Sequence, residues 1–455
     1  MNKGILKTAV VMVLIAGGTA EAQQVTTLNL QDCVNIALDK STAALKGNNN
    51  VALAGAQVLA AYGQFLPNLV AGAGYNFDKG NNFFSSSGGA LIDEAKSQFN
   101  YQLTSSVNIF SGYYNYSSWK ASKLNQQMSE YTLERAKQQI TLDVTQSYLQ
   151  VILDRKIVAL DSANLDISLK REDQLKVLTD IGRKAKTDLY QQQAQTSNDK
   201  LVFISAKNRL QNDKILLLQK LRIDSADSYE IADISVDDGA SAKQYGNRDA
   251  LLQTAMDERV DLKSAELNTK YALWNIKKYK SGYLPSVAFS VGAYNNGAFF
   301  HDLAINGKDA LPVSQEAIPT QLYKYTYGLA AITASWNIFD RFYTKSAVTT
   351  AKINSTNANI DLKDAQIGVT VGVKQAYNDY VNAVQKMETV DVGVNAAEKA
   401  YEAINGRYKE GASDFITEAN AQLVLLQAQQ NRVQASVNLM LQKKVIDYYV
   451  GAVVK

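Results

Sequence analysis

An internal repeat constrains this chain more than any other feature. Residues 37–67 begin with Ala-Leu-Asp-Lys and end with Phe-Leu-Pro, and residues 255–285 begin with Ala-Met-Asp-Glu and end with Tyr-Leu-Pro, at an offset of 218. Farther along, Asn-Ile-Phe at 108–110 recurs at 337–339, and Gly182 recurs as Gly411, both at an offset of 229. The offset between the two copies therefore changes once, by 11 residues. The change lies in one window of each copy, between residues 67 and 108 in the first and between residues 285 and 337 in the second. Because insertions are tolerated at loop tips, each window is predicted to contain a loop.

The two windows are predicted to be β-hairpins, at about 68–112 and 286–341. Apolar residues alternate with small polar ones at Leu69, Ala71, Ala73, Tyr75, Phe77, Phe99, Tyr101, Leu103, Val107, Ile109, Val287, Phe289, Val291, Ala293, Ile332, Ala334, Trp336 and Ile338. Such alternation over about ten residues is typical of outer-membrane barrel strands, although a soluble half-buried sheet shares it. Turn-rich stretches, among them 80–82 and 295–297, predict loops at 79–95 and 296–322, and we expect these loops to face outside the cell.

Long helices are predicted between the hairpins, at about 115–220 and 343–450. The chain has only four prolines, and none lies in residues 68–284. Gly112 and Gly182 are 70 residues apart, which is about 105 Å if the whole segment is helical. Apolar residues lie on more than one flank of this segment, so we expect helical neighbours on both sides. The acidic stretch 227–247 is predicted to be a linker between the copies.

The N-terminus has the three parts of an export signal. Lys3 and Lys7 are basic, residues 8–18 are apolar, and Ala-Glu-Ala at 20–22 is a signal peptidase site. The predicted division is thus a signal peptide at 1–22, copy one at 23–226, the linker at 227–247 and copy two at 248–455. No later segment has enough consecutive apolar residues for a transmembrane helix.

Composition argues against an enzyme. The chain has one cysteine, Cys33, which rules out a disulfide framework and a cysteine-rich metal site, and one histidine, His301, which removes most routes to acid–base catalysis near neutral pH and to a zinc site. We expect Cys33 to be a buried apolar residue and His301 to lie in a hairpin loop without a partner. No catalytic, cofactor-binding or metal-binding residue is predicted. The 47 basic and 44 acidic residues give a net charge of +3, which offers no reason to expect nucleic acid as a partner.

Two hairpins give four strands per chain, which are too few for a barrel with a lumen. Open strand edges do not occur in lipid. If the strands span a membrane, several chains must therefore share one barrel, and the protein is an obligate oligomer.

The sequence resembles the TolC-like outer membrane efflux protein family along essentially the whole mature chain. The resemblance is carried by residues 30–38, Phe-Leu-Pro-Asn-Leu at 65–69 with Gly-Tyr at 74–75, residues 106–112, Tyr-Leu-Pro-Ser at 283–286 and Trp-Asn-Ile-Phe-Asp at 336–340. It implies an α+β membrane protein: a homotrimer with a shared twelve-stranded barrel in the outer membrane of a Gram-negative bacterium and a long α-barrel in the periplasm. It also implies a passive exit duct for efflux or type I secretion, without cofactors, which docks to a periplasmic adaptor protein and an inner-membrane pump of RND or ABC type.

The resemblance also implies a gate where the helices turn at the periplasmic tip. The helix-turn glycines are Gly182 and Gly411, and the gate candidates are Thr187, Asp188, Tyr408, Gly411, Ser413, Thr417, Glu418 and Asn420. Ser413 stands where the family pattern has arginine, and Thr417 and Asn420 stand where it has aspartates. Glu410, Asp414 and Glu418 are nearby acids, and we expect each to be a solvated charge at a helix end.

Two other classes of function compete with the pore. An exported coiled-coil structural or adaptor protein would share the helices and the export signal but would have no hairpins with lipid-facing alternation. An enzyme would require a site that the residues above do not supply. The transported substrate is not specified by the sequence.

Overall fold

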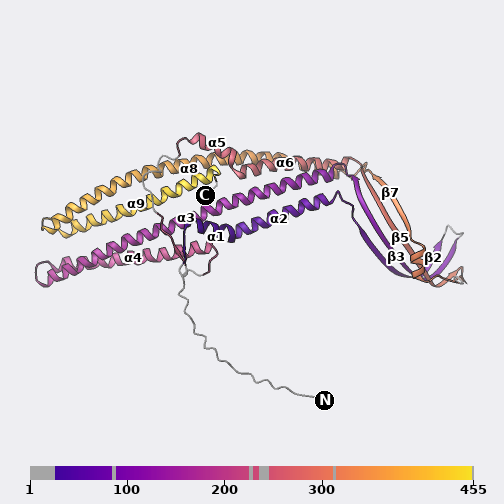
Figure 1. The fold of residues 1–455 in the computed structure, drawn as a ribbon, viewed down its shortest axis with the longest axis horizontal. Coiled ribbons are helices and arrows are strands. Elements are labelled where there is room, and N and C mark those ends of the chain that lie inside the picture. Colours follow the sequence, from indigo (N-terminus) through magenta and orange to yellow (C-terminus); the bar gives the residue numbers. More distant parts are fainter. Residues whose placement is uncertain (1–25, 85–88, 225–228, 235–244, 311–313, 453–455) are drawn as a thin grey trace, which may run out of the picture.

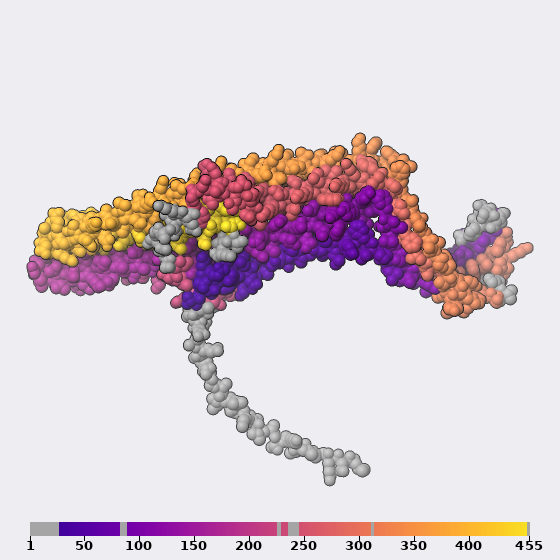
Figure 2. Space-filling model, turned by 45° about the horizontal axis from the view of Figure 1, so that its top comes forward, coloured from indigo at the N-terminus to yellow at the C-terminus, as the bar shows by residue number. Residues whose placement is uncertain are grey.

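The computed structural model describes residues 26–84, 89–224, 229–234, 245–310 and 314–452. They form an elongated molecule with a β-sheet at one end, long helical hairpins at the other and short elements midway (Figure 1). The sheet bends away from a narrow body of helices (Figure 2). The predicted signal peptide and much of the predicted linker lie outside the described residues. Within the described part of the chain, no helix is both long and apolar enough to cross a membrane.

The two halves of the chain have helices of closely matched length. In the first half, α1 (Leu30–Lys40), α2 (Thr42–Gly63), α3 (Tyr114–Asp180) and α4 (Lys186–Lys220) have 11, 22, 67 and 35 residues. In the second half, α5 (Arg248–Glu258), α6 (Val260–Lys280), α8 (Tyr343–Lys409) and α9 (Phe415–Val450) have 11, 21, 67 and 36 residues. At 1.5 Å per residue, α3 and α8 are each about 100 Å long. The helices expected at 115–220 and 343–450 are thus present, and each segment is broken by one turn.

Strands from both halves form one antiparallel sheet. Its four long strands, in spatial order, are β2 (Val70–Phe84), β3 (Ala90–Phe110), β5 (Ser286–Ile305) and β7 (Tyr327–Ser335). β6 (Lys308–Asp309) pairs with the end of β5, and the 3-10 helix η3 (Ser281–Tyr283) precedes β5. Within the described residues, no further strand pairs with the outer edges of β2 and β7.

The strand register gives this sheet one apolar and one polar face. On the apolar face, Phe289 lies opposite Val107 and Ile332, and Ile332 is 71% exposed. The alternate positions of β3 carry Asn100, Gln102 and Thr104, opposite residues of β2 that are small or apolar. The predicted alternation is present in β2, β3 and β5, whereas β7 follows it less cleanly, because its Leu329 and Tyr327 lie on the same face as Thr104 and Gln102. An exposed apolar face of this extent indicates contact with lipid or another protein.

The strands run farther than the sequence predicted, so the predicted bounds of the loops at 79–95 and 296–322 are wrong. β2 continues to Phe84 and β3 begins at Ala90, with residues 80 and 81 paired to 94 and 93. Residues 295–297, expected to be a turn, lie inside β5 opposite residues 99–101 of β3. Continuous pairing between long strands satisfies the backbone there and outweighs the local turn preference of Asn and Gly. Residues 85–88 and 311–313 of these predicted loops are outside the described residues.

The second hairpin turns at Asn306 and Gly307, which have φ values of 52° and 75°. Its return strand, β7, ends at Ser335, so the predicted strand residues Trp336 and Ile338 lie beyond it. The Trp336 indole instead donates a hydrogen bond to the Tyr283 carbonyl oxygen at 3.2 Å.

Two glutamine side chains complete the edge of β5 beyond Tyr294, where the pairing with the first residue of β7 stops. Gln321, in α7 (Ile318–Lys324), donates to the Ala298 carbonyl at 2.8 Å and accepts from the Ala298 amide at 2.9 Å. Gln315 makes the same pair of hydrogen bonds with the backbone of Phe300, at 2.8 and 2.7 Å. The side-chain amides thus take the place of a strand along this edge, which would otherwise expose unpaired backbone groups.

His301 lies in β5, not in a loop, and it has a partner. Its Nε2 is 2.8 Å from the Ser97 hydroxyl, which is 2.9 Å from the Tyr75 hydroxyl. The rings of Phe77 and Phe299 lie on either side of the imidazole, at centroid distances of 5.8 and 5.3 Å. The prediction of an unpartnered loop histidine is therefore wrong, because the strand extends past the predicted turn.

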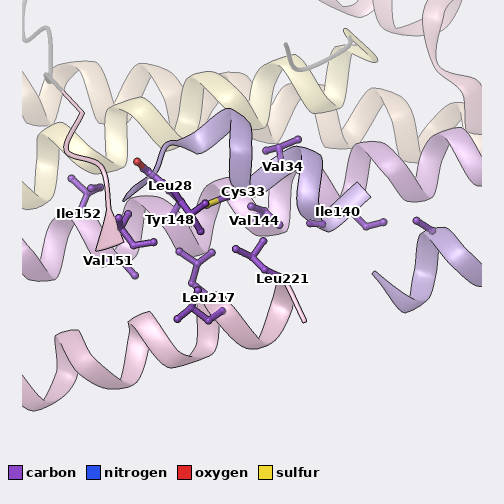
Figure 3. Packing of buried hydrophobic residues seen from close by; sticks show 14 residues of the cluster. Leu28, Cys33, Val34, Ile140, Val144, Tyr148, Val151, Ile152, Leu217 and Leu221 are labelled. Carbon is purple, nitrogen blue, oxygen red and sulfur yellow. The ribbon is translucent and has the colours of Figure 1, made fainter. Parts of the chain in front are cut away.

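The largest apolar core lies midway along the molecule, where α1 packs against α3 and α4 (Figure 3). Cys33 is fully buried there, and burial raises the pKa of its thiol to about 12, which confirms the predicted buried apolar cysteine. The Tyr148 hydroxyl donates to the Ala232 carbonyl at 2.8 Å. This bond joins α3 to the segment that follows β4 (Tyr229–Ile231), which pairs in parallel with β1 (Thr26–Leu28).

Candidate functional site

The tips of the two long hairpins are built in the same way. Gly182, after α3, and Gly411, after α8, have φ values of 77° and 73°. In the first tip, the Arg183 amide donates to the Leu178 carbonyl at 2.8 Å, and the Gly182 amide donates to the Thr179 carbonyl at 3.0 Å. The amides of residues 412 and 411 bond to the carbonyls of 407 and 408 in the same pattern, at 2.8 and 3.1 Å. This motif requires a left-handed residue at its centre, which explains glycine at both turns.

The other predicted gate residues lie around these turns. Thr187 and Asp188 are in the first turn of α4, where Thr187 is exposed and Asp188 is half-buried. Ser413 is half-buried in the turn between α8 and α9. Asn420 is exposed in the second helical turn of α9. All these residues therefore cluster at the end of the molecule opposite the sheet (Figure 1).

Thr417 has a local structural role. Asp414 is the N-cap of α9, and its carboxylate accepts from the Thr417 amide at 2.9 Å and from the Thr417 hydroxyl at 2.7 Å. These hydrogen bonds hold the pKa of Asp414 below its usual value. Asp414 and Thr417 thus satisfy donors at the start of the helix.

Tyr408 contacts both tips. Its ring lies beneath the Lys184 ammonium group of the first tip, 5.2 Å from the ring centroid. Burial raises the pKa of Tyr408; the Arg171 guanidinium opposes this shift, while the Glu418 and Asp188 carboxylates reinforce it. Tyr408 therefore brings together predicted gate residues from both hairpins.

Glu418 is not a solvated charge at a helix end. It is 0% exposed, and its Oε1 accepts from Arg171 Nη2 of α3 at 2.6 Å. Burial raises the pKa of its carboxyl group, although Arg171 works against that shift. The expectation of a solvated charge is wrong because the counter-charge comes from another helix, from a residue 247 positions earlier in the chain.

Sequence reasoning missed the polar contacts that join α3 to α9. Arg171 also donates to Gln422 Oε1 at 2.8 Å, and Gln422 donates to Asn164 Oδ1 at 2.7 Å. Farther from the tip, Gln430 donates to Asp161 Oδ1 at 2.7 Å. The sequence does contain a signal for these contacts. Asp161, Asn164 and Arg171 are spaced three and seven residues apart, which places them on one stripe of a helix.

A second group of buried carboxyl groups lies between α3 and α4. Asp154 is 0% exposed and accepts from Arg209 Nε at 3.0 Å. Burial, a side-chain hydrogen bond with Asp213 and the nearby Asp213 charge raise the pKa of Asp154 to about 6, against the Arg209 charge. Near the tip, the Ser168 hydroxyl donates to Asp199, and both residues are buried. No group of histidine, cysteine and acidic residues in the described part of the chain is arranged to hold a metal ion.

Comparison with known proteins finds matches along the chain. A family model described as "Outer membrane efflux protein" matches residues 251–444. The outer membrane protein TolC of Escherichia coli is 22% identical over 382 residues, which cover 83% of this chain and 72% of that protein. TolC of Vibrio cholerae is 24% identical over 383 residues, covering 83% and 80%.

Solved structures share the fold. The outer membrane protein VceC of Vibrio cholerae matches with a TM-score of 0.77 at 14% identity, over 94% of this chain and 97% of that one. The CmeC outer membrane channel of Campylobacter jejuni matches with a TM-score of 0.76 at 16% identity, over 93% and 85%. At these identities the likeness shows a common architecture, namely long helical hairpins with a partial-barrel sheet at one end.

Proposed function

We propose that the chain is a TolC-like outer membrane efflux protein and that it is the exit duct of a tripartite efflux or type I secretion system. It lies in the outer membrane of a Gram-negative bacterium and reaches into the periplasm as a homotrimer. Its partners are a periplasmic adaptor protein and an inner-membrane pump of RND or ABC type. Proteins of this family are channels and not enzymes, so the pump supplies both the energy and the choice of cargo.

The observation that carries this proposal is the sheet of four long strands with unlike faces. Four strands are too few to close around a lumen, and open edges are not tolerated in lipid. If β2 of one copy pairs with β7 of the next, three copies close a twelve-stranded barrel. The face of Phe289 and Ile332 then meets lipid, and the face of Asn100, Gln102 and Thr104 lines a wet lumen. In this arrangement the strand ends at Phe84, Ala90 and Ile305 lie outside the cell.

We also propose that the chain is a tandem duplication, with units at 23–226 and 248–455, a signal peptide at 1–22 and a linker at 227–247. Two observations support this division: the constant offset of 229 after the hairpins, and the matched helix lengths of the two halves. Three copies of a duplicated chain place six similar units around one axis, which suits a closed ring of helices.

The hairpin tips form the proposed gate at the periplasmic entrance. Its proposed residues are Thr187, Asp188, Tyr408, Ser413, Thr417, Glu418 and Asn420, with Gly182 and Gly411 shaping the turns. Ser413, Thr417 and Asn420 carry no charge, so Asp188 is the proposed source of charge in the constriction. The buried pair of Arg171 and Glu418 fastens the two hairpins to each other within one chain.

Measurement of mass and conductance on the full-length protein tests the proposal. Native mass spectrometry in detergent should give three chains, and planar bilayers should show a small, steady current that rises when the tips are loosened. A monodisperse monomer that inserts without conductance would contradict both the barrel and the duct. The alternative, an exported coiled-coil protein without a pore, gives no role to a sheet with one exposed apolar face.

A further inference from the structure

The helical segments that adjoin the sheet carry only positive charge. Residues 114–129 of α3, 267–280 of α6 and 343–360 of α8 contain eight lysines and no aspartate, glutamate or arginine. Within the described residues, none of these lysines forms an ion pair with an acidic group. The whole chain is nearly balanced in charge, so this end of the helices is electrostatically distinct.

Several of these lysines surround an apolar groove between α3, α6 and α8. Leu124 and Trp274 line the groove, together with Lys270, Lys277, Lys280 and Lys352. The Lys277 ammonium group lies 4.0 Å from the centroid of the Trp274 ring, and Tyr116 packs edge-on against the same indole at 5.6 Å. We call this feature the lysine–aromatic groove. It offers an apolar floor and a cationic margin to one ligand.

The groove lies at the level where lipid headgroups meet the proposed barrel. Lys280 is the last residue of α6, and Lys277 and Lys270 are about 5 and 15 Å farther along the helix at 1.5 Å per residue. The headgroup layer adds about 5–8 Å to each side of the hydrocarbon core. Lysine side chains extend their charged ends several ångströms from the backbone, so the margin of the groove can reach this layer.

The edge of the groove on α3 points away from the lumen of the proposed duct. There the ring of Trp119 lies 6.3 Å from that of Tyr116, which packs on Trp274. Trp119 and Lys123 precede Ile140 and Val144 by three heptads, and the core that α1 forms on α3 contains those two residues. Since α1 must lie outside for the lumen to stay open, the same stripe of α3 faces outward near the sheet. The helices contact one another in the order α2, α3, α6 and α8, so the groove lies within one chain and not at its junction with a neighbouring copy.

We propose that the lysine–aromatic groove binds an anionic phospholipid of the periplasmic leaflet. The phosphate and headgroup lie among the lysines, and an acyl chain covers Leu124 and Trp274 and continues onto the apolar face of the sheet. Ammonium groups without acidic partners are available to a phosphodiester, and Lys277 over Trp274 holds one of them in place. This inference rests on the proposed placement in the outer membrane and adds a defined ligand class to it.

Tryptophan fluorescence can test this directly, because the chain has only three tryptophans, Trp119, Trp274 and Trp336. In the full-length trimer with Trp336→Phe, the two remaining indoles report on the groove and its surroundings. Nanodiscs of phosphatidylethanolamine would contain a minor fraction of brominated phosphatidylglycerol or, in parallel, of brominated phosphatidylethanolamine. We expect brominated phosphatidylglycerol to quench the emission severalfold more strongly than brominated phosphatidylethanolamine at equal content.

Two matched triple variants locate the effect. Lys277→Gln, Lys280→Gln and Lys352→Gln together should reduce quenching by brominated phosphatidylglycerol to the level of phosphatidylethanolamine. Lys200→Gln, Lys207→Gln and Lys399→Gln remove the same charge from exposed sites on the distal helices and should leave the preference unchanged. Both variants are first shown to be trimers by native mass spectrometry, so that a folding defect is not mistaken for lost binding.

Each remaining outcome overturns a defined part of the inference. Equal quenching by the two lipids, or a preference that survives the groove variant, overturns the assigned site. If excess inorganic phosphate abolishes the quenching, the groove does not bind a lipid, because an acyl chain should keep a bound lipid in place. Absence of quenching by either brominated lipid contradicts the membrane placement itself, and so separates failure of the proposed function from failure of this inference.

Discussion

The two long hairpins have opposite chemistry at six matched positions, which are buried in the first hairpin and buried or half-buried in the second. Six buried polar residues of the first hairpin correspond, at the offset of 229, to six apolar residues of the second. The polar set is Asp154, Asp161, Ser168, Gln192, Thr196 and Asp199, and the apolar set is Ala383, Val390, Ala397, Ala421, Leu425 and Ala428. The helices have nearly the same lengths, so the difference lies in the interior and not in the architecture.

This difference indicates that the hairpins respond differently to their surroundings. In the first, Gln192 donates to the Ser168 carbonyl at 3.2 Å, and Arg209 pairs with Asp154, so stability depends on specific partners and on protonation. In the second, Ala383 and Met387 pack with Ala435 and Leu439, so this part of its interior has no group that titrates. The pair of Arg171 and Glu418 joins the two hairpins.

Removing Arg171 should have the largest effect. Arg171→Ala leaves Glu418 buried without its counter-charge, and breaking a buried ion pair in this way typically costs about 3–5 kcal/mol. We expect rapid amide hydrogen exchange in α3 and α9 near the tips, measured by mass spectrometry, with the sheet unchanged. Arg171→Met combined with Glu418→Leu is the control, because it removes both charges and should recover most of the protection. If the single and double variants exchange equally fast, the ion pair does not fasten the hairpins.

Moving a buried carboxyl group into the second hairpin sharpens the comparison. Ala383→Asp places there the group that the first hairpin has at Asp154, but position 438, which corresponds to Arg209, is asparagine. An ion without a partner costs several kcal/mol even after relaxation, and we expect a loss of about 3 kcal/mol in the free energy of unfolding by urea at pH 7.5. Adding Asn438→Arg should restore part of it. If Ala383→Asp leaves the free energy of unfolding unchanged, the apolar interior is not what stabilises this hairpin.

The polar interior should make the first hairpin pH-dependent. Folding raises the pKa of Asp154 from 3.8 to about 6, so the folded state binds the proton more tightly than the unfolded state. The resulting stabilisation is complete below about pH 4 and is lost as the pH rises through 6. Between pH 7.5 and pH 5, the free energy of unfolding should therefore rise by about 1 kcal/mol. Asp154→Asn should lose this dependence in urea titrations followed by circular dichroism, and a variant that keeps it would assign the proton to another group.

Much of the fold could be predicted because it depends on periodic, local signals. The long helices follow from the absence of proline, the strand faces from alternation, and the turns from Gly182 and Gly411. The strand ends were missed because residues 295–297 have a local turn preference that pairing with β3 overrides. The burial of Glu418 was missed because Arg171 reaches it from another helix, which no local pattern reveals.

The smallest expected effects belong to two half-buried tip residues, one from each hairpin, Tyr408 and Asp188. Tyr408 belongs to the second hairpin and packs under Lys184 of the first, and a cation–π contact at such a site contributes about 0.5–1 kcal/mol. Tyr408→Ala should therefore raise the closed-state conductance in planar bilayers, whereas Tyr408→Phe, which keeps the ring, should leave it nearly unchanged.

Asp188, on the first hairpin, is half-buried beside this contact. If it contributes charge to the constriction without fastening the tips, Asp188→Ala should reduce the preference for cations, measured as a reversal potential in a salt gradient, and change leakage little. An exposed ion pair at position 413 would have been worth only about 0–1 kcal/mol, so serine there need not open the tips. Unchanged selectivity in Asp188→Ala would remove that residue from the lumen. Unchanged conductance in Tyr408→Ala would place the closure elsewhere, because the contact between the tips would then have been lost without consequence.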